Sequence, residues 1–135
     1  MLSRRRIFGG CALCGALAIA AGTASAQTPP AGIRRAEVRR HDLAGTNHEA
    51  IQMTLELDPG IEVAYHTHPG IEASYIVDGS VTLTVRGQAP QVITAGGSFM
   101  VPAGTVHAAK NGAGVSKVFI TYIVEKGKPL ATPAA

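Results

Sequence analysis

Short stretches in which apolar and polar residues alternate constrain this chain more than any other feature of its sequence. Between residues 51 and 57, isoleucine, methionine and leucine alternate with glutamine, threonine and glutamate, and residues 81–85 repeat the pattern with valine, leucine and threonine. A two-residue period is typical of a β-strand that buries one face. Residues 118–124, rich in β-branched and aromatic side chains, predict a more deeply buried strand. Because residues 27–135 have no helical hydrophobic period, we expect an all-β fold.

The segments between these strands carry turn signals. Asp78-Gly79 lies between two strand patterns, which is a strong indication of a β-hairpin. Residues 58–60, 95–97 and 102–104 are glycine-containing breaks, two of them with proline. Many short strands joined by such turns predict a small antiparallel β-barrel or jelly roll.

The N-terminal segment, residues 1–26, is predicted to be an export signal. Three arginines at positions 4–6 precede an apolar run from residue 11 to 21, and Ala24-Ser25-Ala26 supplies the small residues of a cleavage site. Arg5-Arg6-Ile7-Phe8 is similar to the core of twin-arginine signals, so we favour that route over the general secretory route. An uncleaved anchor is the alternative, although the run is short for a membrane span. The expected location is periplasmic or secreted.

The charge balance argues against nucleic acid as a partner. The chain holds 12 basic and 9 acidic residues, but residues 1–26 contain three of the arginines and none of the acidic residues. The remaining chain is therefore neutral, which gives no electrostatic basis for binding nucleic acid or anionic lipid, and no stable membrane span is expected after signal removal. Cys11 and Cys14 both lie inside the signal, so the mature chain is expected to lack thiols.

The chain is long enough for one domain. We expect a flexible leader at residues 27–35, the barrel at residues 36–125, and a tail at residues 126–135 that is loose unless it docks.

Three histidines and a glutamate form a candidate metal site. His66 and His68 are two residues apart, so both point to the same face of a strand. Glu72 follows the bend at Pro69-Gly70, and His107 comes just after the turn at residues 102–104. Imidazoles and a carboxylate suit borderline divalent metals. His-x-His alone is weak evidence, because separate surface histidines are common.

Two longer motifs strengthen this prediction. The first is Gly60-x5-His66-x-His68-x3-Glu72-x6-Gly79. The second, sixteen residues further on, is Gly96-x5-Pro102-x-Gly104-x2-His107-x3-Asn111. Both resemble the conserved motifs of the cupin superfamily at every defined position, and the flanking strands extend the resemblance over roughly residues 36–125. The chain is therefore similar to small single-domain cupins.

The resemblance implies a fold and a metal, and it leaves the reaction open. It implies that His66, His68, Glu72 and His107 hold one divalent ion. Iron or manganese is favoured if the chain folds before export, with nickel, cobalt, copper or zinc as alternatives. The expected function is a metalloenzyme acting on a small organic molecule bound directly to the metal, with oxygenase chemistry ahead of lyase or isomerase chemistry. The alternative is a non-catalytic binding or sensor module. In some cupins the glutamate leaves the metal, so Glu72 is also a candidate base.

Strand alternation gives a candidate lining for the pocket. The side chains predicted to point inward near the metal are Met53, Leu55, Ala64, Ile76, Phe99, Val101 and Tyr122. This lining has few charges beyond the ligands, which favours a small neutral or singly charged substrate. The arginines at positions 34, 35, 39 and 40 are expected on a solvated strand edge. By resemblance, residues 34–40 could also pair two chains in a homodimer.

Overall fold

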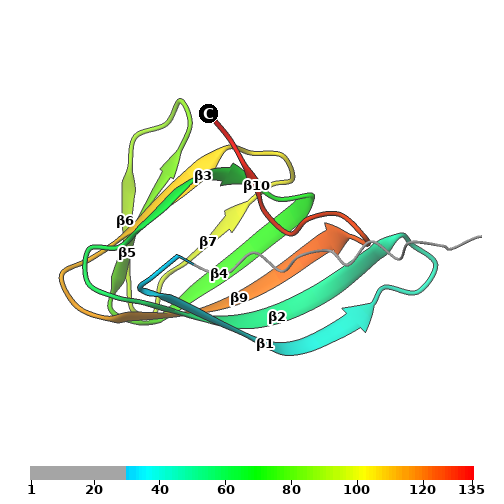
Figure 1. Ribbon diagram of the computed structural model, residues 1–135, viewed down its shortest axis with the longest axis horizontal. Helices are drawn as coiled ribbons and strands as arrows, with labels where there is room; N and C mark the ends of the chain where they lie inside the picture. Colours follow the sequence, from blue (N-terminus) through cyan, green and yellow to red (C-terminus); the bar gives the residue numbers. More distant parts are fainter. Residues whose placement is uncertain (1–29) are drawn as a thin grey trace, which may run out of the picture.

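The computed structural model describes residues 30–135, and within that range it is built from strands alone (Figure 1). The strands are β1 (Ile33–Asp42), β2 (His48–Leu57), β3 (Glu62–Thr67), β4 (Gly70–Asp78), β5 (Ser80–Val85), β6 (Gln91–Thr94), β7 (Ser98–Val101), β8 (His107–Asn111), β9 (Ser116–Glu125) and β10 (Thr132–Pro133). Among these residues there is no helix of the length and apolarity needed to cross a membrane. The predicted export signal, with Cys11 and Cys14, lies outside the described residues.

Two five-stranded antiparallel sheets form the two layers visible in Figure 1. One sheet has the order β1-β2-β9-β4-β7 and the other has the order β10-β3-β8-β5-β6. Strands that are distant in the sequence therefore become neighbours, as β9 does between β2 and β4. The prediction of an all-β jelly roll is confirmed.

The hydrophobic core lies between the two sheets and follows from the alternation in the sequence. Along β9, the buried residues Val118, Ile120, Tyr122 and Val124 alternate with more exposed ones. Ile76 of β4 is fully buried in the same layer. β4 and β9 thus turn one face to the core, as a two-residue period requires.

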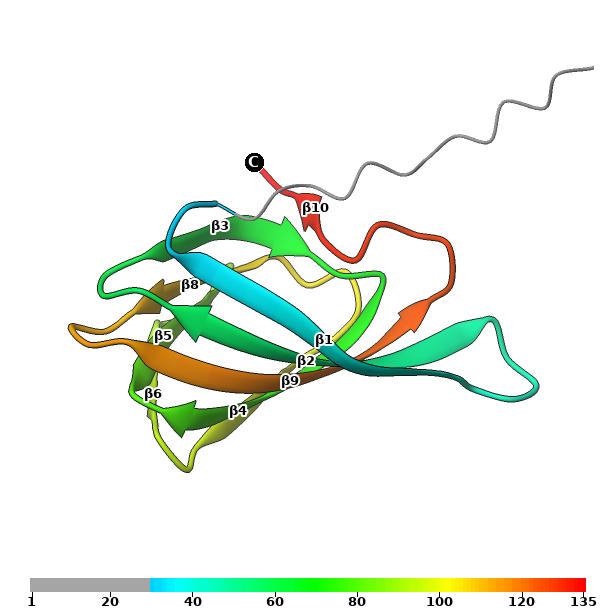
Figure 2. The ribbon, with the colours of Figure 1, turned by 60° about the horizontal axis from the view of Figure 1, so that its bottom comes forward.

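The two ends of the described chain are more ordered than the sequence predicts. The predicted leader overlaps the start of β1, because Ile33 is buried and pairs with Leu57 of β2. The tail after residue 125 docks: β10 pairs with β3, and Leu130 packs against the core. Figure 2 shows this C-terminal segment beside the end of β3. The expected boundaries at residues 35 and 126 are therefore not breaks in the structure.

Gly70 sits where β4 passes very close to β9. A Cβ atom added there would lie 1.9 Å from the carbonyl oxygen of Ile123 and 2.6 Å from the Cα of Val124. Only glycine permits this approach, because no side chain fits between the two backbones. The contact fixes the first residue of β4, two positions before Glu72, and so sets where that carboxylate enters the barrel.

Candidate metal centre

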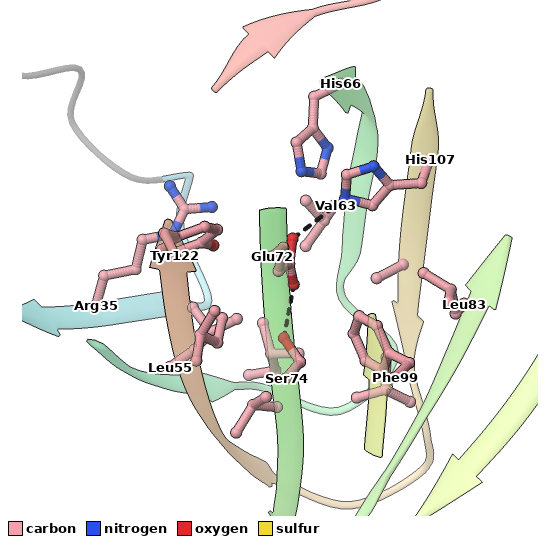
Figure 3. Close-up of a pocket in the computed structure, with 15 residues that line it drawn as sticks. Arg35, Leu55, Val63, His66, Glu72, Ser74, Leu83, Phe99, His107 and Tyr122 are labelled. Atoms are coloured by element: carbon pink, nitrogen blue, oxygen red, sulfur yellow. Dashed lines mark hydrogen bonds and ion pairs between the residues drawn. The ribbon is translucent and has the colours of Figure 1, made fainter. Parts of the chain in front are cut away.

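Four side chains predicted to bind a metal converge inside the barrel. His66 lies on β3, His68 in the loop after it, Glu72 on β4 and His107 on β8. One ligating atom from each residue lies within 4.8 Å of the other three. His68, Glu72 and His107 are buried, and His66 is half-buried. Figure 3 shows the side chains of His66, Glu72 and His107 pointing toward one another from three strands.

Strand pairing explains how residues nearly forty positions apart meet. His66 is the direct cross-strand partner of His107 in the β3–β8 ladder. The register of that ladder shifts between Val63 and His66, which marks a β-bulge. A bulge adds a residue to one strand and reverses the direction of the side chains beyond it. Val63 and His66 therefore both face the interior although they are three residues apart.

Each histidine has its Nδ1 atom held by a backbone carbonyl. The acceptors are Ala64 for His66 at 2.8 Å, Leu130 for His68 at 2.6 Å and Thr105 for His107 at 2.9 Å. A carbonyl oxygen only accepts hydrogen bonds, so Nδ1 must carry the hydrogen in all three rings. The lone pair of each neutral ring is then on Nε2, the atom that faces the centre of the cluster. Such carbonyl contacts are the usual means of orienting metal-binding histidines.

The distances between donor atoms fit a shared divalent ion. The Nε2 atoms of His66 and His68 are 3.2 Å apart, and Oε2 of Glu72 is 2.8 Å from Nε2 of His68 and 3.3 Å from Nε2 of His107. Two donors about 2.1 Å from one ion lie about 3.0 Å apart at a right angle and about 3.4 Å apart at the tetrahedral angle. Facing lone pairs at this separation repel unless a proton or a cation lies among them. The residues present therefore fit a divalent metal.

The charges in the cluster support the same conclusion. Burial tends to raise the pKa of Glu72, but hydrogen bonds with His107, His68 and Ser74 outweigh it, so this pKa lies well below its usual value. Burial tends to lower the pKa of His107, yet its contact with Glu72 raises it overall. Burial lowers the pKa of His66. Glu72 is thus ionised at neutral pH and provides the one negative charge beside the three rings.

Ser74 holds the second oxygen of the carboxylate. Its hydroxyl donates to Oε1 of Glu72 over 2.7 Å, while Oε2 faces the histidines (Figure 3). This arrangement orients Glu72 to offer a single oxygen to a metal. The suggested role of Glu72 as a base remains a prediction.

A cavity of about 50 Å³ adjoins the cluster, with His66, Glu72 and His107 in its wall. That volume is room for a few water molecules. Most of the remaining wall is apolar and is formed by Leu55, Leu57, Val63, Val81, Leu83, Phe99, Ala109, Val118 and Ile120. The position suits a small ligand that reaches the metal through an apolar surround.

The structure places three of the seven predicted lining residues in the cavity wall, namely Leu55, Phe99 and Tyr122. Ile76 and Val101 face inward as predicted, but they are buried in the core without lining the cavity. Met53 packs against the core without lining the cavity. Ala64 was wrongly predicted to line the pocket: it is exposed, because the bulge on β3 breaks the alternation that was counted back from His66.

Tyr122 is the one tyrosine in the cavity wall; Tyr65 and Tyr75 are exposed. Its ring lies 4.9 Å from that of His68, centroid to centroid. Burial and the nearby Glu72 charge raise the pKa of Tyr122 well above its usual value, against a smaller opposite effect of Arg35. The hydroxyl therefore remains protonated and able to donate a hydrogen bond.

Arg35 is a cavity residue that the sequence did not reveal. It was expected on a solvated edge with its neighbouring arginines, but it lines the cavity beside Tyr122 (Figure 3). β1 lacks an alternation of apolar and polar residues, so nothing in its sequence indicates which arginines face inward. Only the pairing of Arg35 with Leu55 reveals the direction of its side chain.

Comparison with known proteins identifies one matching family. Residues 53–128 match the family model described as Cupin domain. No curated protein matches the chain. Many solved structures share the fold.

Three of these structures illustrate the range of sequence identity. An RmlC-like cupin from Shewanella frigidimarina is 29% identical, with a TM-score of 0.58, over 71% of this chain and 79% of that one. KdgF from Halomonas sp. is 22% identical, with a TM-score of 0.58, over 71% of this chain and 82% of that one. The DMSP lyase DddQ from Ruegeria pomeroyi is 16% identical, with a TM-score of 0.58, over 63% of this chain and 43% of that one. The chain thus spans less than half the length of DddQ.

Proposed function

We propose, from the premise that this chain belongs to the cupin domain family, that it is a metalloenzyme acting on a small organic molecule bound directly to a divalent metal. The observation that carries the proposal is the position of the His66, His68, Glu72 and His107 cluster at the wall of an apolar cavity. The exposed Arg35 and half-buried His66 also line this cavity, so it reaches the surface. A purely structural metal needs no such access.

Each residue around the cavity has a distinct role in this proposal. The Nε2 atoms of the three histidines and Oε2 of Glu72 would hold the ion, which supplies Lewis acidity and, for iron, redox chemistry. Ser74 fixes the free oxygen of Glu72. Tyr122 keeps its proton and can donate a hydrogen bond to the bound molecule. Phe99 and Leu83 belong to the apolar wall, which would contact the carbon atoms of the bound molecule.

Oxygenase chemistry is our first choice of reaction type. Imidazole with a carboxylate is the ligand class of non-haem iron oxygenases, in which positions beside the protein ligands remain open. Lyase and isomerase chemistry need only the Lewis acid and a proton carrier, and they are alternatives at the same site. DddQ, which shares this fold, is a DMSP lyase, and the experiment below therefore includes the lyase alternative.

A non-catalytic binding or sensor module is the second candidate, and the small volume of the cavity favours it. About 50 Å³ admits only part of most metabolites. In such a module the metal would mainly stabilise the fold. An ion at a thousand times its dissociation constant adds about 4 kcal/mol of stability.

The location, the metal and the assembly belong to the proposal as well. We propose a periplasmic or secreted protein loaded with iron or manganese, supported by the signal-like pattern of residues 1–26. We propose a homodimer that pairs through β1, which lies at the edge of its sheet. Copper or zinc alone in protein purified from its native compartment would contradict the metal assignment.

The decisive experiment combines metal analysis with a reaction screen. Elemental analysis of the full-length protein identifies the ion, and oxygen uptake is then followed with small phenols, diketones and organic acids. We expect one class to consume oxygen only with the metal-loaded protein. Conversion of a substrate without oxygen uptake would favour a lyase or isomerase, and binding without turnover would favour the sensor module.

A further inference from the structure

Arg35 differs from its neighbours on β1 in the direction of its side chain. In the β1–β2 ladder, Ile33 pairs with Leu57 and Arg35 pairs with Leu55, and both β2 partners line the cavity. Directly paired residues of antiparallel strands lie on the same face. Arg35 is therefore on the inner face of β1, whereas Arg34 is on the outer one.

Two other arginines of β1 already bind carboxylates of the chain. Arg34 binds Glu56 at 2.6 Å and Asp58 at 2.8 Å. Arg40 binds Glu37 at 2.9 Å and Glu49 at 2.8 Å. Within residues 30–135, no ion pair or side-chain hydrogen bond involves Arg35. Its guanidinium keeps donors available at the cavity, and among the described lining residues it is the sole arginine or lysine.

The geometry points to a carboxylate subsite: we propose that Arg35 binds the carboxylate of a small organic acid whose other end binds the metal. Arg35 lines the same cavity as His66, Glu72 and His107, and Figure 3 shows it beside Tyr122, on the other side of the view from His107. One molecule in the cavity would therefore meet the guanidinium at one end and the metal ligands at the other. A guanidinium binds a carboxylate through two parallel hydrogen bonds. The inference rests on the proposed function, because it names the substrate class of that same site.

The charges of the site agree with an anionic substrate. A divalent ion on three neutral imidazoles and the Glu72 carboxylate leaves one net positive charge, and Arg35 adds a second. The hydroxyl of Tyr122, which lines the cavity beside Arg35, is a further donor to an oxygen anion. A single guanidinium serves one carboxylate, whereas a phosphate is normally held by several basic groups. The substrate class is accordingly a short monocarboxylic acid with a second oxygen, such as a hydroxyl or carbonyl, for the metal.

The test measures ligand binding to the Mn²⁺-loaded, full-length protein by calorimetry. The probes are 3-hydroxypropanoate, 4-hydroxybutanoate and 4-oxopentanoate, each compared with its methyl ester. The variants are Arg35→Met and Arg35→Lys. Arg39→Met is the matched control, because Arg39 lies on the same strand but pairs with Gln52 on the outer face.

We expect at least one acid to bind about tenfold or more tightly than its ester, as a lost charged hydrogen bond implies. Arg35→Met should abolish that preference, Arg35→Lys should restore part of it, and Arg39→Met should leave it unchanged. Equal binding of acids and esters by the wild-type protein, or an unchanged preference in Arg35→Met, overturns the proposal. Mn²⁺ is titrated first: failure of every protein to bind Mn²⁺ contradicts the metal site itself, which distinguishes the two failures.

Discussion

His68 donates its Nδ1 hydrogen to the backbone carbonyl of Leu130, 62 residues later in the chain, over 2.6 Å. The C-terminal tail therefore orients a metal ligand. His66 and His107 take their carbonyl partners from residues two positions away, so His68 alone among the three depends on a distant segment. A ring that loses this contact is free to rotate or to change tautomer.

Truncation of the tail should weaken metal binding. A chain ending at Lys128 loses the Leu130 carbonyl, whereas a chain ending at Ala131 keeps it and loses β10 with the last two residues. We expect the shorter chain to bind Mn²⁺ about 10 to 100 times more weakly than the full-length protein, the range typical for loss of a group that orients a ligand. The longer one should stay close to the full-length value. Equal affinities of the two truncated chains, measured by calorimetry, would refute this role.

The sequence predicted the fold and the four converging side chains because both follow from local patterns. Alternation identifies strands, and the spacing of His66, His68, Glu72 and His107 carries the resemblance to a family. Alternation does not predict which inward side chains border the cavity. Ile76 and Val101 face inward, as alternation requires, yet neither lines the cavity. Which inward residues reach it depends on how the two sheets pack, which is a long-range property.

Three other features left no readable signal in the sequence. The bulge before His66 reversed the assignment of Ala64, and bulges are set by the partner strand as much as by their own residues. Arg35 lies on an edge strand without apolar alternation, so its direction depends on pairing with Leu55. Leu130 contributes a backbone carbonyl, and any residue type provides one.

Glu72→Gln should abolish tight metal binding while the protein remains folded. Glutamine has nearly the same shape, but it removes the only negative charge among the four ligands. We expect the affinity for Mn²⁺ to fall by more than about a hundredfold, beyond the usual effect of an outer contact. Glu62→Gln is the control, because that exposed glutamate on β3 pairs only with Lys110. A similar loss in both variants would mean that overall charge, rather than coordination, controls binding.

Thermal stabilisation by the metal should increase with pH. In the metal-free protein, the raised pKa of His107 stabilises the fold at pH values below 6.5, the ordinary pKa of histidine. This stabilisation is lost as the pH rises through the raised pKa. The lowered pKa of Glu72 stabilises the fold at pH values above 4.5, the ordinary pKa of glutamate. This stabilisation is lost as the pH falls through the lowered pKa. The metal-free contribution of this pair is therefore greatest between these two ordinary values.

Metal binding, in contrast, becomes stronger as the pH rises, because the ion must displace the proton from His107. The difference in Tm between Mn²⁺-loaded and EDTA-treated protein should thus be larger at pH 8 than at pH 5.5. Differential scanning fluorimetry across this range provides the measurement. A difference that stays constant or shrinks toward pH 8 would indicate that the ion binds elsewhere.

Gly70→Ala should destabilise the whole barrel. The new Cβ would lie 1.9 Å from the carbonyl oxygen of Ile123, and backbone atoms on both strands would have to separate. We expect the free energy of unfolding to fall by at least about 2 kcal/mol, as for other overpacked sites. Metal affinity should fall with it, because β4 carries Glu72 two residues further on.

Gly114→Ala is the matched control for this variant. A Cβ at Gly114 meets no atom within 4 Å, and its backbone conformation is open to other residues. We expect a change in unfolding free energy within about 0.5 kcal/mol, as at ordinary surface positions. Urea denaturation of the two variants gives both values under one set of conditions. If Gly70→Ala were as stable as Gly114→Ala, the close approach of β4 to β9 would not be what positions Glu72.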